Sequence, residues 1–147
     1  MKCKDVMLTL VFKCTEDTSV AECARIMRDE QLGFMPVLDS DNSVVGVVTD
    51  RDLVTRVLAD RRDHTTRVGE IMSTGPILSC RPDDDLRALE KRMAQAKKGR
   101  ALVRDDTGDL LGVISLSDVA QREVSPTRTG QLLREVTRRE SVSLIHP

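Results

Sequence analysis

The chain of 147 residues carries one pattern twice, and this internal repeat restricts the folds that it can adopt. When the sequence is shifted by 66 positions, apolar residues, glycines, hydroxyl residues and acids fall on residues of the same kind. The matched pairs include Val11 with Ile77, Cys14 with Cys80, Met27 with Met93, Gly46 with Gly112, Thr49 with Ser115 and Asp52 with Asp118. The sequence therefore predicts two copies of one small unit, residues 1–59 and 68–123, with a charged linker at 60–67 and a tail at 124–147.

Each copy predicts the element order strand, helix, strand, strand, helix, which is an α/β (α+β) arrangement. Apolar residues at helical spacing predict the first helix, and β-branched runs joined by polar loops predict a hairpin. In the first copy the elements are a strand at 11–14, a helix with the stripe Val20, Cys23, Ala24 and Met27, strands at 34–38 and 44–49, and a helix with Leu53, Val54, Val57 and Leu58. One copy of this length has a marginal core, so we expect the two copies to pack on each other.

The second copy repeats this order with one irregularity in its first helix. Its strands are expected at 77–80, 101–104 and 110–115. The helical stripe consists of Leu86, Leu89 and Met93, and the acid Glu90 interrupts it.

Composition excludes several classes of partner. The chain has 23 basic and 24 acidic residues and neither Trp nor Tyr, which argues against nucleic-acid binding. No apolar run approaches the roughly 18 residues of a membrane-spanning helix. The four cysteines form no C-x-x-C pair and lack zinc spacing, so we expect reduced, buried thiols and no metal site. These features predict a soluble, cytoplasmic protein.

A doubled motif follows the third strand of each copy. It reads Gly-Val-Val-Thr-Asp-Arg-Asp at 46–52 and Gly-Val-Ile-Ser-Leu-Ser-Asp at 112–118. A strand that enters a helix through a hydroxyl residue offers free N–H groups and a positive dipole end, which suit a phosphate. An Asp three residues later can accept two hydrogen bonds from a ribose diol, and Arg51 can add positive charge. The motif therefore indicates a nucleotide site.

The same motif has a structural interpretation that needs no ligand. Ser/Thr-x-x-Asp is close to a capping box, in which the two side chains satisfy the first N–H groups of a helix. The occurrence of two copies in register, each with a glycine three residues before the hydroxyl, favours the ligand site. Whether both copies bind is left open by the sequence.

The repeated unit resembles a cystathionine-β-synthase (CBS) domain, and the chain resembles a tandem CBS pair. The features that carry the resemblance are the doubled Gly-x-x-Thr/Ser-x-x-Asp, the openings Val6-Met7 and Ile71-Met72, and the run Gly33-Phe34-Met35-Pro36-Val37. The resemblance implies two βαββα repeats packed sheet to sheet about a pseudo-twofold axis. It also implies flat homodimers and a regulatory role in signal transduction or energy sensing.

The resemblance further implies clefts for adenosine-containing ligands such as AMP, ADP, ATP, S-adenosylmethionine or NAD. Asp52 and Asp118 would hold ribose hydroxyls, and Thr49 and Ser115 would meet phosphate or ribose. The walls against adenine would be Cys14, Thr15, Met35 and Pro36 in the first copy and Cys80, Arg81, Ala101 and Leu102 in the second. Because Ser117 stands where the first copy has Arg51, we expect the first copy to be the better phosphate site.

Other functions compete with an adenosyl-ligand sensor that acts in trans on an unknown protein target. A ligand-free dimerisation scaffold would use both motifs only as caps, and a redox or metal sensor would use the cysteines. We expect no enzyme, because the sequence shows no P-loop and no nucleophile–histidine–acid set. In the tail, Leu132, Leu133 and Val136 predict a narrow apolar helix face, and 141–145 alternates like a strand. The tail is expected to pack on its own protein or to dock a partner.

Overall fold

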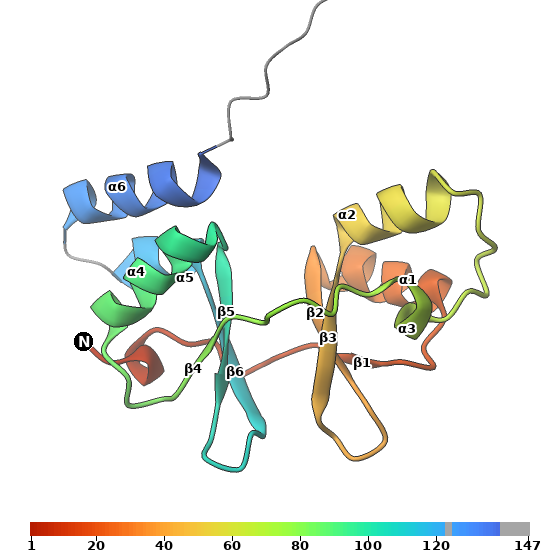
Figure 1. Ribbon diagram of the computed structural model, residues 1–147, viewed down its shortest axis with the longest axis horizontal. Coiled ribbons are helices and arrows are strands. Elements are labelled where there is room, and N and C mark those ends of the chain that lie inside the picture. The colour runs from red at the N-terminus through yellow and green to blue at the C-terminus, as the bar shows by residue number, and fades with distance from the viewer. Residues whose placement is uncertain (123–124, 139–147) are drawn as a thin grey trace, which may run out of the picture. The chain divides into compact units, whose positions relative to one another are not determined.

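The computed structural model describes residues 1–122 and 125–138, and it contains two compact units that are not continuous halves of the chain (Figure 1). The first unit consists of Thr9–Ile77 together with Asp105–Leu111. The second unit consists of Met1–Leu8, Leu78–Arg104 and the described residues from Gly112 onward. The N-terminal segment of the chain therefore belongs to the unit that is built mainly from the second repeat.

The first unit is a three-stranded sheet with helices packed on it. Strand β1 pairs in parallel with β2, and β2 pairs antiparallel with β3. Its elements are β1 (Cys14–Thr15), α1 (Val20–Glu30), β2 (Phe34–Leu38), β3 (Val44–Thr49), α2 (Asp50–Asp52), the π-helical segment η2 (Leu53–Leu58) and α3 (Val68–Ile71). Ser19 caps helix α1, because its hydroxyl accepts from Glu22 N at 3.1 Å, and Val20, Cys23 and Met27 of the helix are buried in the core.

The second unit repeats this arrangement and adds a helix at its end. Its sheet order is β4-β5-β6, and β4 pairs in parallel with β5. Its elements are the 3₁₀ turn η1 (Cys3–Asp5), β4 (Ser79–Cys80), α4 (Leu86–Ala96), β5 (Arg100–Arg104), β6 (Leu110–Ser115), α5 (Leu116–Arg122) and α6 (Pro126–Thr137). None of the helices in the described ranges is both long and apolar enough to cross a membrane.

The predicted element order is confirmed in both units, but the first strand of each repeat was predicted too long. Only Cys14 of the expected strand at 11–14 lies in β1, and only two residues of 77–80 lie in β4. In the first unit a turn ends the strand, because Thr15 N donates to Thr18 Oγ1 at 3.1 Å and Thr18 N to Thr15 O at 3.1 Å. A two-residue strand therefore suffices to pair with the central strand.

The opening segment of each repeat forms a backbone bridge to the edge strand of the unit that is built mainly from the other repeat. Leu8 exchanges two backbone hydrogen bonds with Val113 of β6, at 2.9 and 3.0 Å. Ser73 does the same with Val47 of β3, at 3.0 and 2.8 Å. Val47 and Val113 are equivalent in the sequence repeat, so the two units use the same construction.

This close approach explains the first glycine of each doubled motif. A methyl group at Gly112 would lie 2.7 Å from Leu8 O, and one at Gly46 would lie 2.9 Å from Ser73 O. Real side chains essentially never come this near to backbone oxygen, so the passing segment requires glycine.

Ion pairs also hold the N-terminal segment on the second unit. Lys2 Nζ and Lys4 Nζ lie 2.9 and 2.7 Å from Asp83 Oδ1. The hydrogen bonds and charges of these two lysines lower the pKa of the Asp83 carboxyl to about 2. All three side chains are exposed, so these ion pairs contribute little to the stability of the folded protein.

Within the predicted tail, Pro126–Thr137 form helix α6, which packs on α4 and α5 of its own unit. Leu132 is buried, whereas Leu133 keeps 51% of its surface exposed. The structure therefore contains a helix where the apolar face was predicted, but only Leu132 of that face is buried. The predicted strand at 141–145 lies outside the described residues.

Candidate functional site

The turn after β3 brings the first predicted hydroxyl and acid together. Thr49 Oγ1 accepts from Asp52 N at 3.1 Å, and Asp52 Oδ2 accepts from Thr49 N at 3.0 Å. This reciprocal pair is a complete capping box at the start of α2. It fixes the carboxylate of Asp52 beside the first turn of the helix.

Asp52 has two further neighbours that come from later parts of the chain. Ser73 Oγ donates to the carboxylate and lies 3.3 Å from both of its oxygens. Arg56 Nε lies 3.8 Å from Asp52 Oδ1, and Arg56 Nη1 donates to Ile71 O and Met72 O at 3.0 and 3.1 Å. Asp52 is only 8% exposed, so these donors replace much of the water that the carboxylate would otherwise bind.

The turn after β6 has the same form with different partners. Asp118 Oδ2 accepts from Ser115 N at 2.7 Å and from Ser115 Oγ at 2.5 Å, and Asp118 N donates to Ser115 Oγ at 3.3 Å. The hydroxyls of Ser115 and Ser117 lie 2.7 Å apart. Asp118 is less buried than Asp52. The two turns are therefore alike in backbone form and different in the hydrogen bonds that a ligand would have to replace.

Sequence reasoning missed Arg56 and Ser73, which lie near the first turn, although the repeat in the sequence contains a signal for Arg56. Arg56 matches Arg122 at the same shift of 66 positions, one turn of helix beyond each Asp. Arg122 Nη1 donates to Asp5 O at 3.2 Å, so each arginine fastens the opening segment beside its turn. Ser73 has no such signal, because the opening segment of the other repeat has Leu8 at that place.

Arg51, the predicted phosphate ligand, lies at the first turn with an exposed side chain. Its neighbour Asp50 accepts a hydrogen bond from Arg51 N at 2.9 Å, and Asp50 N donates to Gly33 O at 3.1 Å. The side chain of Arg51 is thus exposed to solvent, and Asp50 is the residue just before it in the chain. The net charge that a phosphate would meet at this turn depends on both side chains.

The predicted wall residues divide into buried and exposed groups. Thr15 and Arg81 are exposed, whereas Cys14 and Met35 pack in the core of the first unit. A ligand can contact such buried residues mainly through their backbone or after a local rearrangement. The remaining wall residues are also buried, and they are Pro36, Cys80, Ala101 and Leu102.

The four buried cysteines form two neighbouring pairs of free thiols. A hydrogen bond joins the thiols of Cys23 and Cys14, and another joins those of Cys3 and Cys80. These hydrogen bonds and burial raise the pKa values of the Cys23 and Cys3 thiols. The same hydrogen bonds lower the pKa values of the Cys14 and Cys80 thiols. Within residues 1–122 and 125–138, no group of three or more His, Cys, Asp or Glu side chains is placed to hold a metal ion.

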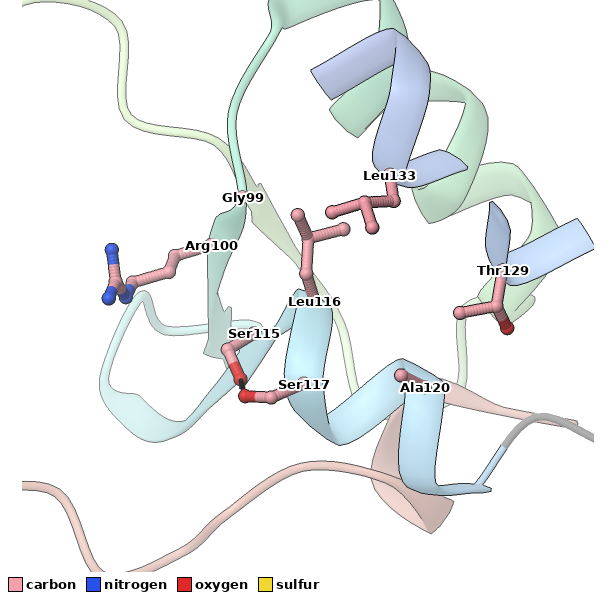
Figure 2. A pocket seen from close by; sticks show the side chains of 8 residues that line it. All are labelled: Gly99, Arg100, Ser115, Leu116, Ser117, Ala120, Thr129 and Leu133. Atoms are coloured by element: carbon pink, nitrogen blue, oxygen red, sulfur yellow. Dashed lines mark hydrogen bonds between the residues drawn. The ribbon is translucent and has the colours of Figure 1, made fainter. Parts of the chain in front are cut away.

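A cavity of about 410 Å³ lies beside the second turn, within the second unit (Figure 2). Its walls come from the start of β5, the end of β6, α5 and α6. Figure 2 shows the side chains of Leu116 and Leu133 pointing into the same space, while that of Arg100 points away from it. The lining residues are Gly99, Arg100, Ser115, Leu116, Ser117, Ala120, Thr129 and Leu133.

Comparison with known sequences identifies both repeats. The CBS domain family matches residues 3–59 and 68–125 of this chain. The CBS domain-containing protein YhcV of Bacillus subtilis is 31% identical over 134 residues, which cover 91% of this chain and 94% of YhcV. The match thus extends over nearly the whole of both proteins.

Solved structures agree with this assignment. A conserved CBS domain protein of unknown function from Thermoplasma acidophilum aligns with a TM-score of 0.79 and 22% identity, over 95% of this chain and 78% of that one. The CBS domain pair of protein MJ0100, solved with 5′-methylthioadenosine and S-adenosyl-L-methionine, aligns with a TM-score of 0.72 and 20% identity, over 82% of this chain and 94% of that one. The doubled motif, the repeated βαββα unit and these matches together show that the chain belongs to the CBS domain family, of which it carries two tandem copies.

Proposed function

We propose that this protein is a regulatory module that binds an adenosine-containing ligand at its Thr/Ser-x-x-Asp turns and signals to a separate target protein. CBS pair proteins are regulatory modules, and the CBS pair of MJ0100 was solved with two adenosyl compounds. The observation that carries the proposal is the presence, in both units, of a carboxylate held at a helix start beside a hydroxyl. The ligands in question are AMP, ADP, ATP, S-adenosylmethionine and NAD.

Each turn offers complementary groups to the two ends of such a ligand. Asp52 and Asp118 each have two carboxylate oxygens, which together can accept about four hydrogen bonds, so a ribose diol can share them with the cap. The hydroxyls of Thr49 and Ser115 can turn toward a phosphate, and the helix start favours negative charge. Regulation then requires that the ligand bind one conformation of the protein more tightly than another.

A thermal-denaturation screen tests the proposal on the protein as it is. Because the chain has no Trp or Tyr, differential scanning calorimetry is the suitable readout. A ligand at one hundred times its dissociation constant stabilises the folded state by about 2.7 kcal/mol, which raises Tm by roughly 5–10 °C in a chain of this size. We expect this shift with at least one of the five adenosyl compounds and none with GTP. No shift with any of the five would contradict the proposal.

We expect the Thr49–Asp52 turn to favour phosphorylated ligands more strongly than the Ser115–Asp118 turn does. Arg51→Ala should weaken binding of ATP or AMP more than binding of adenosine, because only the phosphorylated ligands meet the guanidinium. Titration calorimetry in the Asp118→Ala background isolates this site. Arg87→Ala, an exposed arginine on α4, controls for the change of net charge. Equal losses for ATP and adenosine would remove the assigned role of Arg51.

A ligand-free scaffold remains the second candidate function, and one observation favours it. Both turns satisfy their own N–H groups through capping boxes without any ligand. In this alternative the motifs are structural and the protein acts only through its surfaces. The thermal screen separates the two functions, because a scaffold would show a cooperative transition that no adenosyl compound moves.

We also propose that the protein is a homodimer. In the first unit, α1 and η2 form an apolar groove of about 240 Å³ that includes Val20, Ala24 and Val57. At its edge Leu58 is 74% exposed, which is unusual for a leucine of a monomer when other apolar residues adjoin it. Light scattering at several protein concentrations gives the mass directly, and a monomer at all concentrations would contradict the proposal.

A further inference from the structure

We propose that helix α6 closes the ligand site of the second unit, so that binding at the Ser115–Asp118 turn and docking of α6 strengthen each other. This inference rests on the proposed function, because it concerns how that site is regulated.

Helix α6 is held on the second unit by a partly buried ion pair as well as by apolar contact. Arg128 Nη2 lies 3.2 Å from Glu90 Oε1, and Glu90 is only 8% exposed. Leu132, one turn farther along α6, is buried. Glu90 is the acid that interrupts the apolar stripe of α4, and its partner on α6 explains why the stripe tolerates it. If α6 leaves, this carboxylate loses its counter-charge.

The first unit lacks the residue on which this docking depends. The position equivalent to Glu90 is Ala24, which is exposed and lines the groove between α1 and η2. An α6-like helix would find no carboxylate there for the guanidinium of Arg128. The ion pair that holds α6 is therefore specific to the second unit.

A short path of contacts joins the second turn to α6. Leu116 stands between Ser115 and Ser117, and its N donates to Gly99 O at 2.9 Å. A methyl group at Gly99 would lie 3.3 Å from Leu116 Cδ1 and 3.7 Å from Val136 Cγ1, so a side chain of the turn and a side chain of α6 both lie beside this glycine. Leu116 also lines the same cavity as Leu133 of α6, so it is the residue of the turn through which we expect a change to reach α6.

The cavity explains why a bound ligand should favour the docked state of α6 over the undocked state. It adjoins Ser115 and Ser117, and α6 supplies Thr129 and Leu133 to its wall (Figure 2). A ligand that extends from the turn into this space buries surface against α6 only while α6 is docked. The docked state therefore binds the ligand more tightly, and by linkage the ligand makes docking more favourable.

Hydrogen exchange of residues 125–137 tests this coupling directly. The experiment uses ATP and S-adenosylmethionine as probes on the whole chain, in the variants Asp52→Ala and Asp118→Ala. We expect the probe that binds to slow exchange in α6 when only the second site is intact, in Asp52→Ala. In Asp118→Ala, where the second site is removed, we expect the probe to leave the exchange rates in α6 unchanged.

A matched pair of variants tests the wall of the cavity in the Asp52→Ala background. Leu133→Ala removes half-exposed apolar surface from the wall and should weaken the binding of the probe about threefold to tenfold. Gln131→Ala changes an exposed residue of the same helix outside the wall and should change affinity by less than about twofold.

The outcomes separate this inference from the proposed function. If a probe binds the second site but neither slows exchange in α6 nor responds to Leu133→Ala, the coupling is wrong and the proposed function stands. If neither probe binds the second site, the coupling fails, and the proposed function fails as well only if AMP, ADP and NAD also leave the wild-type protein unchanged in the thermal screen. Slower exchange in α6 together with the Leu133→Ala loss supports both.

Discussion

Gly112→Ala is expected to lower the free energy of unfolding by about 1–3 kcal/mol, although it adds a single methyl group. That methyl would lie 2.7 Å from Leu8 O and 3.2 Å from Met7 Sδ. The oxygen is not free to move, because Leu8 and Val113 exchange two backbone hydrogen bonds. The substitution therefore pushes the N-terminal segment away from β6, which costs part of the packing of the second unit. Denaturant unfolding followed by far-ultraviolet circular dichroism measures the loss.

Gly130→Ala is the matched control for this prediction. A methyl group at Gly130 would meet nothing within 4 Å, and the residue lies inside helix α6. Alanine is the better helix former, so we expect stability to rise by up to about 1 kcal/mol. Opposite signs for the two glycines would support the account of the N-terminal segment. A Gly112→Ala protein as stable as wild type would show that the segment does not pack against β6 in solution.

The second large effect concerns binding rather than stability. Asp118→Ala should weaken binding of a ribose-containing ligand at the second site by at least about 100-fold. Each hydrogen bond to a charged acceptor contributes about 1.5–3 kcal/mol, and the substitution removes two of them. Titration calorimetry in the Asp52→Ala background measures this site alone.

Stability and ligand chemistry provide the controls for Asp118→Ala. Loss of the cap should cost about 1 kcal/mol, which leaves the protein folded, and calorimetric unfolding checks this. A 2′-deoxy form of the ligand should lose affinity for the protein with Asp118 but little for Asp118→Ala, because the missing hydroxyl then has no partner to lose. Equal losses in both proteins would place the ribose elsewhere.

Local features of the sequence were sufficient to predict much of this fold. The amphipathic spacing of Val20, Cys23 and Met27 predicted α1, and the same residues are buried in its core. The Thr/Ser-x-x-Asp spacing predicted either a cap or a ligand site, and the structure shows that the cap is formed. Such features depend on residues within one turn or one hairpin, and this is why a single sequence reveals them.

Two features that sequence reasoning missed depend on contacts between distant segments. Ser73 reaches Asp52 only because the segment after α3 crosses beside β3. The acid Glu90 interrupts the apolar stripe of α4, and its ion pair with Arg128 of α6 accounts for its burial. No local pattern contains these pairs, since the residues of each lie more than twenty positions apart.

The central claim is that this protein binds an adenosine-containing ligand, and isothermal titration of purified, ligand-free wild-type protein tests it most directly. AMP, ADP, ATP, NAD and S-adenosylmethionine are titrated in turn, with GTP as the control for phosphate and ribose without adenine. We predict saturable binding heat with at least one adenosyl compound and none with GTP. A folded protein that gives no heat with any of the five, at two temperatures to exclude a vanishing enthalpy, would contradict the claim and leave the scaffold as the function.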